Sequence, residues 1–302
     1  MSDILVVGSL AYDSIQTPLG RADRALGGSA NYFSLAASLH AGVRVVGVVG
    51  QDYEAKDLEL LKGRGVDLSG VDIVAGSTFH WEGEYQGDMN EAITKATHLN
   101  VFEKFKPQLP AAFRSTPYVF LANIDPELQI QVLDQCENPR FVAMDTMNFW
   151  ITSKRKALEM VLGRVDAFLV NEGEAKMLTG ASNAIAAAKA LSQMGPKVVV
   201  IKRGEYGFMA SIHGELFAFP AYPIERVVDP TGAGDSFAGG FFGYLAKEKQ
   251  TTERGAVRRA CFMGALTASF TVQDFSVRSL AKLTSKDLEV RRNDFLQIVN
   301  LG

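Results

Sequence analysis

The chain has 302 residues, of which 47% are hydrophobic and 22% are charged, a composition typical of a globular protein rather than a disordered one. Its 31 basic and 34 acidic side chains nearly cancel, and the net charge of −3 gives no general attraction to nucleic acid or anionic lipid. Two cysteines, and four histidines without metal-ligand spacing, exclude a disulfide scaffold and a cysteine-rich zinc site.

The N-terminal segment lacks the basic start and the long apolar stretch of an export signal, and no window approaches 18 apolar residues. We therefore expect a soluble, cytoplasmic protein with no membrane and no nucleic acid among its partners. The length alone is compatible with two domains or with one large α/β domain.

Short apolar runs alternate with amphipathic stretches along most of the chain. The runs are continuous, which predicts strands of a sheet covered on both faces, at residues 4–7, 43–49, 118–122, 141–144, 167–170 and 198–201. Helical patterns lie between them at residues 30–40, 126–135 and 184–194. This alternation predicts right-handed crossovers and a mostly parallel sheet.

Two segments break the alternation. Residues 14–26 are polar and typical of a loop, whereas residues 78–101 contain an alternating stretch from Phe79 to Tyr85 that predicts an exposed strand. We expect one domain over residues 1–302, with a small β-sheet lid formed by insertions near 14–26 and 78–101. Phe79, Trp81 and Tyr85 share a parity, so one face of the strand can carry all three rings. A hairpin is predicted around His213-Gly214.

A glycine-rich stretch near the C-terminal third predicts an anion site. Gly232 and Gly234 permit positive φ, and a helix is expected to begin near Gly234, so that backbone N–H groups and the helix dipole face a ligand. Asp235 follows in the first turn. Its carboxylate either complements the helix dipole or serves as a general base for a substrate hydroxyl beside the anion site.

Two other nucleotide motifs are missing. The sequence has no GxxxxGK[ST] loop, and the first strand is followed by Gly8-Ser9-Leu10-Ala11 rather than by a GxGxxG fingerprint. A nicotinamide-dependent oxidoreductase is therefore disfavoured.

The segment from Asp229 to Phe237 resembles the C-terminal motif of the ribokinase-like (phosphofructokinase-B) family of sugar and nucleoside kinases. Four more segments resemble motifs of that family and occur in the family's order: Gly8-Ser9 with Asp13, Gly27-Gly28-Ser29-Ala30-Asn31, Asn171-Glu172-Gly173-Glu174, and Gly204-Glu205-Tyr206-Gly207. Together the motifs span about three quarters of the chain. The resemblance implies a ribokinase-like three-layer α/β/α sandwich with a mostly parallel sheet and a small β-sheet lid.

The resemblance also implies residue roles. Asp235 would be the catalytic base, with an anion hole formed by the N–H groups of Gly232, Ala233 and Gly234. Asn171 and Glu174 would organise Mg²⁺ through water beside the phosphates of ATP, which Thr231 and Gly204 also contact. Hydroxyls of the acceptor would be bound by Asp13, Gly28 and Asn31. Phosphoryl transfer depends mainly on such positioning and charge neutralisation.

Several positions leave alternatives open. Lys202 stands where the family usually has a small hydroxyl residue, and it is either a phosphate clamp or a solvated residue at a strand end. Trp81 and Tyr85 either cover the ring of the acceptor or form the core of the lid. Many family members bind a monovalent cation at the residue matching Asp229, so K⁺ is a candidate cofactor. In the neighbouring loop, Ser276 stands in place of the family's glycine.

We therefore expect a carbohydrate kinase that transfers the γ-phosphoryl group of ATP to a hydroxyl of a small sugar. A nucleoside kinase of the adenosine type is the alternative, and a non-catalytic ligand sensor on the same fold is a weaker one. The few arginines near the early motifs favour an unphosphorylated acceptor. The exposed edge of a lid sheet is a pairing surface, which predicts a homodimer through the lid.

Overall fold

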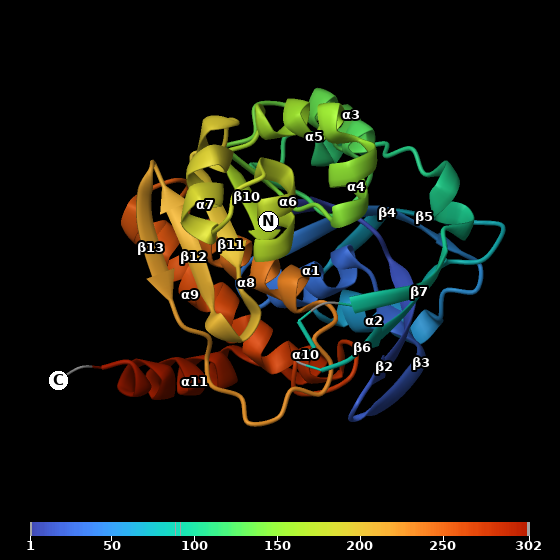
Figure 1. Ribbon diagram of the computed structural model, residues 1–302. Helices are drawn as coiled ribbons and strands as arrows, with labels where there is room; N and C mark the ends of the chain where they lie inside the picture. The colour runs from blue at the N-terminus through green and yellow to red at the C-terminus, as the bar shows by residue number, and fades with distance from the viewer. Residues whose placement is uncertain (1, 88, 91, 301–302) are drawn as a thin grey trace.

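The computed structural model describes residues 2–87, 89–90 and 92–300, and strands alternate with helices through most of this length (Figure 1). The strands are β1 (Ser2–Val7), β2 (Ala11–Thr17), β3 (Gly20–Gly27), β4 (Gly42–Gly50), β5 (Asp67–Val74), β6 (Phe79–Tyr85), β7 (Ala92–His98), β8 (Tyr118–Leu121), β9 (Phe141–Met144), β10 (Ala167–Asn171), β11 (Val198–Lys202), β12 (Phe208–Ile212) and β13 (Glu215–Phe219). The helices are α1 (Ser29–Ala37), α2 (Ala55–Gly63), α3 (Pro126–Gln135), α4 (Asn148–Ser153), α5 (Arg155–Leu162), α6 (Glu172–Thr179), α7 (Ala184–Gln193), α8 (Ala233–Lys247), α9 (Arg254–Thr271), α10 (Arg278–Lys282) and α11 (Ser285–Ile298). Short 3-10 helices are η1 (Asn100–Lys104), η2 (Ala111–Phe113) and η3 (Gly204–Tyr206).

The main sheet has nine strands in the described part of the chain, in the order β13-β12-β11-β10-β9-β8-β1-β4-β5. Its pairs are parallel except at one edge, where β12 pairs antiparallel with both β11 and β13. The six predicted buried strands all lie in this sheet, and the predicted hairpin at His213-Gly214 joins β12 to β13. The sequence pattern did not predict β5, because this edge strand is largely exposed and its sequence lacks a continuous apolar run.

Helices cover both faces of the main sheet, as the continuous apolar runs predict. Along β1, Ile4 and Val6 enter one apolar cluster, whereas Leu5 and Val7 enter another. The first cluster is closed by α1, α8 and α9, and the second by α3, α5, α6 and α7 (Figure 1). The three-layer α/β/α arrangement with a mostly parallel sheet is thereby confirmed. No helix in the described residues is long and apolar enough to cross a membrane.

A second, smaller sheet has the strand order β3-β2-β6-β7. The prediction of a strand at Phe79–Tyr85 is confirmed. Residues 14–26 have a sequence typical of a loop, but they form most of the antiparallel hairpin of β2 and β3, which joins β6 in the predicted small sheet. Its inward residues Ile15 and Ala22 are buried against Tyr85, while charged neighbours on the exposed side mask the alternation in the sequence. Residues 88 and 91 of the predicted lid segment lie outside the described residues.

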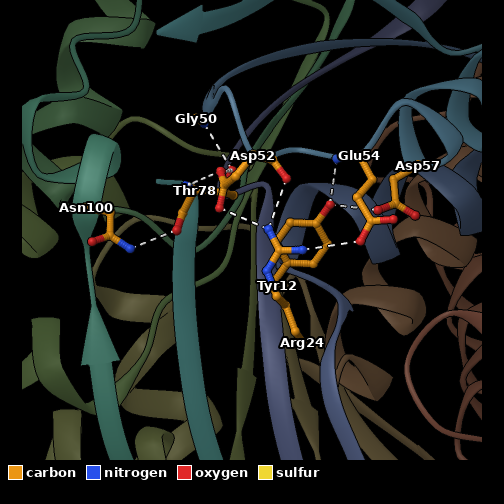
Figure 2. Close-up of polar contacts among 8 residues, drawn as sticks. All are labelled: Tyr12, Arg24, Gly50, Asp52, Glu54, Asp57, Thr78 and Asn100. Carbon is orange, nitrogen blue, oxygen red and sulfur yellow. Dashed lines mark hydrogen bonds and ion pairs between the residues drawn. The ribbon is translucent and has the colours of Figure 1, made fainter. Parts of the chain in front are cut away.

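Polar contacts tie the β2–β3 hairpin to the loop that follows β4 (Figure 2). The Tyr12 hydroxyl donates to Asp57 Oδ2 and accepts from the Glu54 N–H, both at 2.8 Å. The Arg24 guanidinium lies 4.1 Å above the Tyr12 ring and reaches carboxylate oxygens of Asp52 at 3.0 Å and Glu54 at 3.2 Å. The hairpin is therefore anchored by buried hydroxyl bonds under an exposed ion-pair layer.

The start of β6 and the end of β7 are anchored at the same place (Figure 2). Asp52 Oδ1 accepts from both the N–H and the Oγ1 of Thr78 at 2.7 Å, and Thr78 Oγ1 in turn accepts from the Gly50 N–H at 3.0 Å. Asn100 Nδ2 donates to the Thr78 carbonyl at 2.9 Å. The passages of the chain from β5 to β6 and from β7 toward β8 therefore meet at one polar cluster.

Phe242 of α8 provides a test of the packing between this helix and the main sheet. Its ring is fully buried and lies 5.5 Å from the rings of both Phe120 and Phe141. We expect Phe242→Ala to lower the free energy of unfolding by about 3–5 kcal/mol, the range for deleting a buried aromatic ring. Urea unfolding measures this, with the exposed Met160→Ala as a control that should change it by less than about 0.5 kcal/mol. A Phe242→Ala loss no larger than that of the control would contradict the packing.

Candidate active site

The glycine-rich stretch forms a tight turn that leads into α8. Gly232 is the N-cap with φ 73°, and the Tyr32 ring from α1 lies where a Cβ at Gly232 would be, so both backbone and space require glycine. Gly234 does not use the positive φ that glycine permits, since it lies in the first turn of α8 and is helical. Its missing side chain instead admits Lys202, whose Nζ would be 2.9 Å from a Cβ there.

Hydrogen bonds fix the shape of this turn. The Ala233 N–H donates to the Pro230 carbonyl at 3.1 Å, so in this conformation the predicted anion hole is left to Gly232 and Gly234. The Thr231 N–H donates to Asp229 Oδ1 at 2.9 Å, and its hydroxyl donates to Tyr85 of β6 at 3.3 Å. The small sheet therefore touches the turn directly.

Asp235 lies in the first turn of α8, beside acidic and basic groups from the main sheet. Burial and, after it, the negative charge of Asp145 raise the pKa of its carboxyl, Lys202 and the Asp235 N–H lower it, and the net pKa is about 7. A carboxyl with this pKa exchanges protons near neutral pH, which is the property required of a general base.

Three neighbouring strands of the main sheet supply polar and charged groups on the side of the sheet where Asp235 lies. Asp145 follows β9, Asn171 ends β10 and Lys202 ends β11. Lys202 Nζ lies 3.1 Å from Asp145 Oδ2, and both side chains are largely buried. Burial by itself lowers the pKa of Lys202, but Asp145, Glu174 and Asp235 together raise it above its ordinary value. Lys202 is therefore a buried, protonated cation and not a solvated residue at a strand end.

Asn171 and Glu174 form a capping box at the start of α6. Asn171 Oδ1 accepts from the Glu174 N–H at 2.7 Å, and Glu174 Oε2 accepts from the Asn171 N–H at 3.0 Å. Burial raises the pKa of Glu174 to about 7, and the nearby Asp145 contributes. The described residues contain no cluster of three metal ligands. A pair of buried carboxyls is nevertheless a donor set that fits Mg²⁺ shared with phosphate and water.

The second group of predicted residues lies on β2 and at the start of α1. Asp13 of β2 is buried, and its carboxylate occupies the space of a Cβ at Gly27. Burial and, after it, the charge of Asp229 raise the pKa of Asp13, the Gly28 N–H lowers it, and the net pKa is about 8. Asn31 is fully buried and donates to the Gly27 carbonyl at 2.6 Å. The strongest charges acting on Asp13 are thus negative.

Residues of the small sheet lie beside the glycine-rich turn and the loop after β11. Trp81 and Tyr85 share one apolar cluster, whereas Phe79 instead stacks on Phe102 at 5.5 Å, so the three rings do not act together. Trp81 Nε1 donates to Thr94 Oγ1 at 3.2 Å. At Gly204, where φ is 55°, a Cβ would meet the Asn90 side chain. The β6–β7 hairpin therefore approaches the loop that follows β11 as well as the turn at Thr231.

Asp229 is held by backbone donors on both sides. Its Oδ1 accepts from the Thr231 N–H and its Oδ2 from the Ser276 N–H, each at 2.9 Å. Ser276 has φ 59°, a conformation that favours glycine, and its hydroxyl donates to the Leu26 carbonyl at 2.5 Å. The expectation that Ser276 replaces a glycine agrees with this backbone conformation.

Two residues near the site were not predicted from their spacing in the sequence. Tyr53 donates to Asn31 Oδ1 at 3.2 Å, and Tyr32 packs on Gly232. Tyr32 directly follows the Gly-Gly-x-x-Asn segment, which was the one signal available for it.

The chain was compared with known families and proteins. Residues 1–283 match the family described as pfkB family carbohydrate kinase. The chain is 35% identical over 261 residues to a cytidine kinase of Thermococcus kodakarensis, covering 84% of this chain and 92% of that protein. It is 29% identical over 292 residues to a nucleoside kinase of Methanothermobacter thermautotrophicus, covering 90% of each. The fold is similar to that of an Arabidopsis thaliana ribokinase complexed with ribose and ATP, with a TM-score of 0.77 at 23% identity over 97% of this chain and 99% of that one. The chain therefore belongs to the pfkB family of carbohydrate kinases, phosphotransferases that act on a hydroxyl acceptor.

Proposed function

We propose that this kinase transfers the γ-phosphoryl group of ATP to a hydroxyl of an uncharged, ribose-containing acceptor, with Asp235 as the general base. The observation that carries the proposal is the Asp235 carboxyl, with its pKa of about 7, in the first turn of α8 beside the Gly232 turn. Such a carboxylate accepts a proton from a hydroxyl near neutral pH while the helix N-terminus favours the negative charge of the transferred group.

In the proposed step, Asp235 takes the proton of the acceptor hydroxyl as the hydroxyl oxygen bonds to the γ-phosphorus. The bond between that phosphorus and the bridging oxygen breaks, and ADP keeps the bond's electron pair. Gly232 and Gly234 N–H groups face the transferred oxygens, and the protonated Lys202 balances charge that develops toward ADP.

Glu174, with Asp145 beside it, is the residue that we propose to hold Mg²⁺, through water and together with Asn171. Magnesium bound there would neutralise charge on the phosphates of ATP. A cation at this position would also favour the ionised form of Glu174, whose pKa burial otherwise raises to about 7. Gly204 and Thr231 remain our candidates for further contacts to the nucleotide, and K⁺ beside Asp229 remains a proposal.

The acceptor is the least constrained part of the function. Asp229 and Asp235 place negative charge around Asp13, which disfavours a phosphorylated or carboxylated acceptor. The similarity to a cytidine kinase over 84% of the chain favours a nucleoside, and a free sugar is the second candidate. Asp13, Gly28 and Asn31 would position its hydroxyls, with Trp81 and Tyr85 closing the site from the small sheet. A coupled ADP-release screen over nucleosides, pentoses, hexoses and keto-deoxy acids discriminates between them.

Asp235→Asn tests the general base. We expect kcat to fall by at least about 10²-fold, the low end for the loss of such a group. In the unchanged enzyme, kcat/KM should fall as the pH drops below about 7, because the base must be deprotonated to accept a proton. Steady-state ADP release across pH 5.5–9 measures both effects.

As a control, circular dichroism and ATP binding should show that Asp235→Asn is folded and still binds the nucleotide. If Asp235→Asn keeps the kcat of the unchanged enzyme, Asp235 is not the base. If the residual activity of Asp235→Asn still falls as the pH drops below about 7, a group other than Asp235 causes the pH dependence of kcat/KM.

Lys202→Met tests the phosphate clamp. Because the ammonium lies against Gly234 and near Glu174, we expect the variant to raise the KM for ATP and to lower kcat, with kcat/KM for ATP falling at least about 10-fold. The KM for the acceptor should change much less. Lys189→Met, at an exposed position of α7, is the matched control. An equal loss toward both substrates would point to general damage rather than to a clamp.

We also propose a homodimer that forms through the small sheet, whose edge strands are β3 and β7. Ile93 of β7 is 46% exposed and leaves an apolar side chain on that edge. Light scattering should give twice the 32.8 kDa mass of the chain, and Ile93→Lys should shift the protein toward the monomer. Leu296→Lys on α11 is the control. A monodisperse monomer of the unchanged protein would refute the dimer.

A further inference from the structure

Tyr32 is a buried tyrosine that faces the site from α1. Its side chain is 1% exposed, and its ring packs on Gly232, one of the two residues whose N–H groups would form the anion hole. The charged groups that act on its hydroxyl come from β2, from the turn and from α8, namely Asp13, Asp229 and Asp235. The Tyr32 ring belongs to the apolar cluster between α1, α8 and the main sheet, and the negative charges of Asp229 and Asp13 act on its hydroxyl.

The Tyr32 hydroxyl has no hydrogen-bond partner among the described residues. Three other buried tyrosines do have one: Tyr12 donates to Asp57, Tyr53 to Asn31, and Tyr118 to the Gln250 carbonyl at 2.9 Å. A buried hydroxyl without a partner destabilises the folded state, so a phenylalanine would serve packing better at this position. The hydroxyl is thus unexplained by the stability of the fold.

The environment makes this phenol a hydrogen-bond donor. Burial and the charges of Asp229 and Asp13 raise the pKa of Tyr32 well above its ordinary value, so the proton stays on the oxygen. A sugar hydroxyl needs one acceptor for its proton and one donor for its oxygen. Asp13 can accept, whereas the Asn31 amide already donates to the Gly27 carbonyl at 2.6 Å. Tyr32 adds a second donor at this end of the site, beside the remaining N–H of the Asn31 amide.

We propose that the Tyr32 hydroxyl donates a hydrogen bond to a hydroxyl of the acceptor other than the one that is phosphorylated, and so positions the acceptor for transfer. The proposal rests on the proposed function and assigns a specificity role to a residue outside the family motifs. Tyr32 directly follows Asn31, a candidate contact to the acceptor, in α1, and Asp229 and Asp13 act on its hydroxyl more strongly than Asp235 does.

Tyr32→Phe removes only the oxygen. We expect the KM for the acceptor to rise roughly 3- to 10-fold, the range for one hydrogen bond, with the KM for ATP unchanged. The melting temperature of the free protein should stay the same or rise, because an unpartnered buried hydroxyl is lost. Tyr118→Phe is the matched control, for which we expect a lower melting temperature and an unchanged KM. An unchanged KM for the acceptor in Tyr32→Phe would overturn the proposal.

Acceptor analogues that lack one hydroxyl each provide the second measurement. For the analogue missing the hydroxyl that Tyr32 contacts, the unchanged enzyme and Tyr32→Phe should have the same kcat/KM, whereas they should differ for the others. If Tyr32→Phe is weaker by the same factor for every analogue, the tyrosine has a general structural role and the proposal fails.

The experiments distinguish the proposed kinase function from the role proposed for Tyr32. If the unchanged protein forms no ADP with any nucleoside or sugar, the proposed function fails before Tyr32 is tested. If it is active and Tyr32→Phe matches it with every acceptor, only the role of Tyr32 is overturned.

Discussion

Near the carboxyl edge of the main sheet, Asp13 and Glu174 are buried and Asp235 is half-buried, and the loss of solvation raises the pKa of each carboxyl to about 7 or 8. Each group would be better solvated in water, so its placement depends on stabilisation from elsewhere. The apolar clusters on both faces of the sheet supply it, and the Lys202–Asp145 ion pair offsets part of the repulsion. The same desolvation and repulsion give carboxyls that exchange protons near neutral pH. The destabilisation of the folded state and the capacity for proton transfer therefore have one origin.

The layers of the fold could be predicted because strands buried on both faces are apolar without interruption, as in β8 and β9. Where only one face is buried, the pattern is weaker. The β2–β3 hairpin has buried residues such as Ile15 and Ala22 between exposed charged ones, and its sequence is typical of a loop. The edge strand β5 was missed for the same reason. Local sequence does not reveal which neighbour covers a side chain, and the formation of the β2–β3 hairpin and of β5 depends on such neighbours.

The candidate site was predictable where its backbone N–H groups and its side chain come from one continuous segment, as in the turn from Asp229 to Asp235. It was not predictable where the contact joins distant segments. Lys202 and Asp145 are 57 residues apart and meet because β9, β10 and β11 are neighbours in the sheet. The reason for glycine at position 234 is likewise a contact with Lys202 and not a backbone angle. Tyr32 is a further case, because its significance depends on the absence of a partner in three dimensions.

The capping box at Asn171 and Glu174 links the metal chemistry proposed for this site to the folding of α6. The bonds that cap the start of the helix are those that orient the Glu174 carboxylate, so forming the capping box also sets the direction of that group. The spacing of three residues is the spacing that a capping box requires. An insertion or deletion of one residue between the two would therefore disturb the helix start and the carboxylate together, and this segment can change its residue types far more easily than its length.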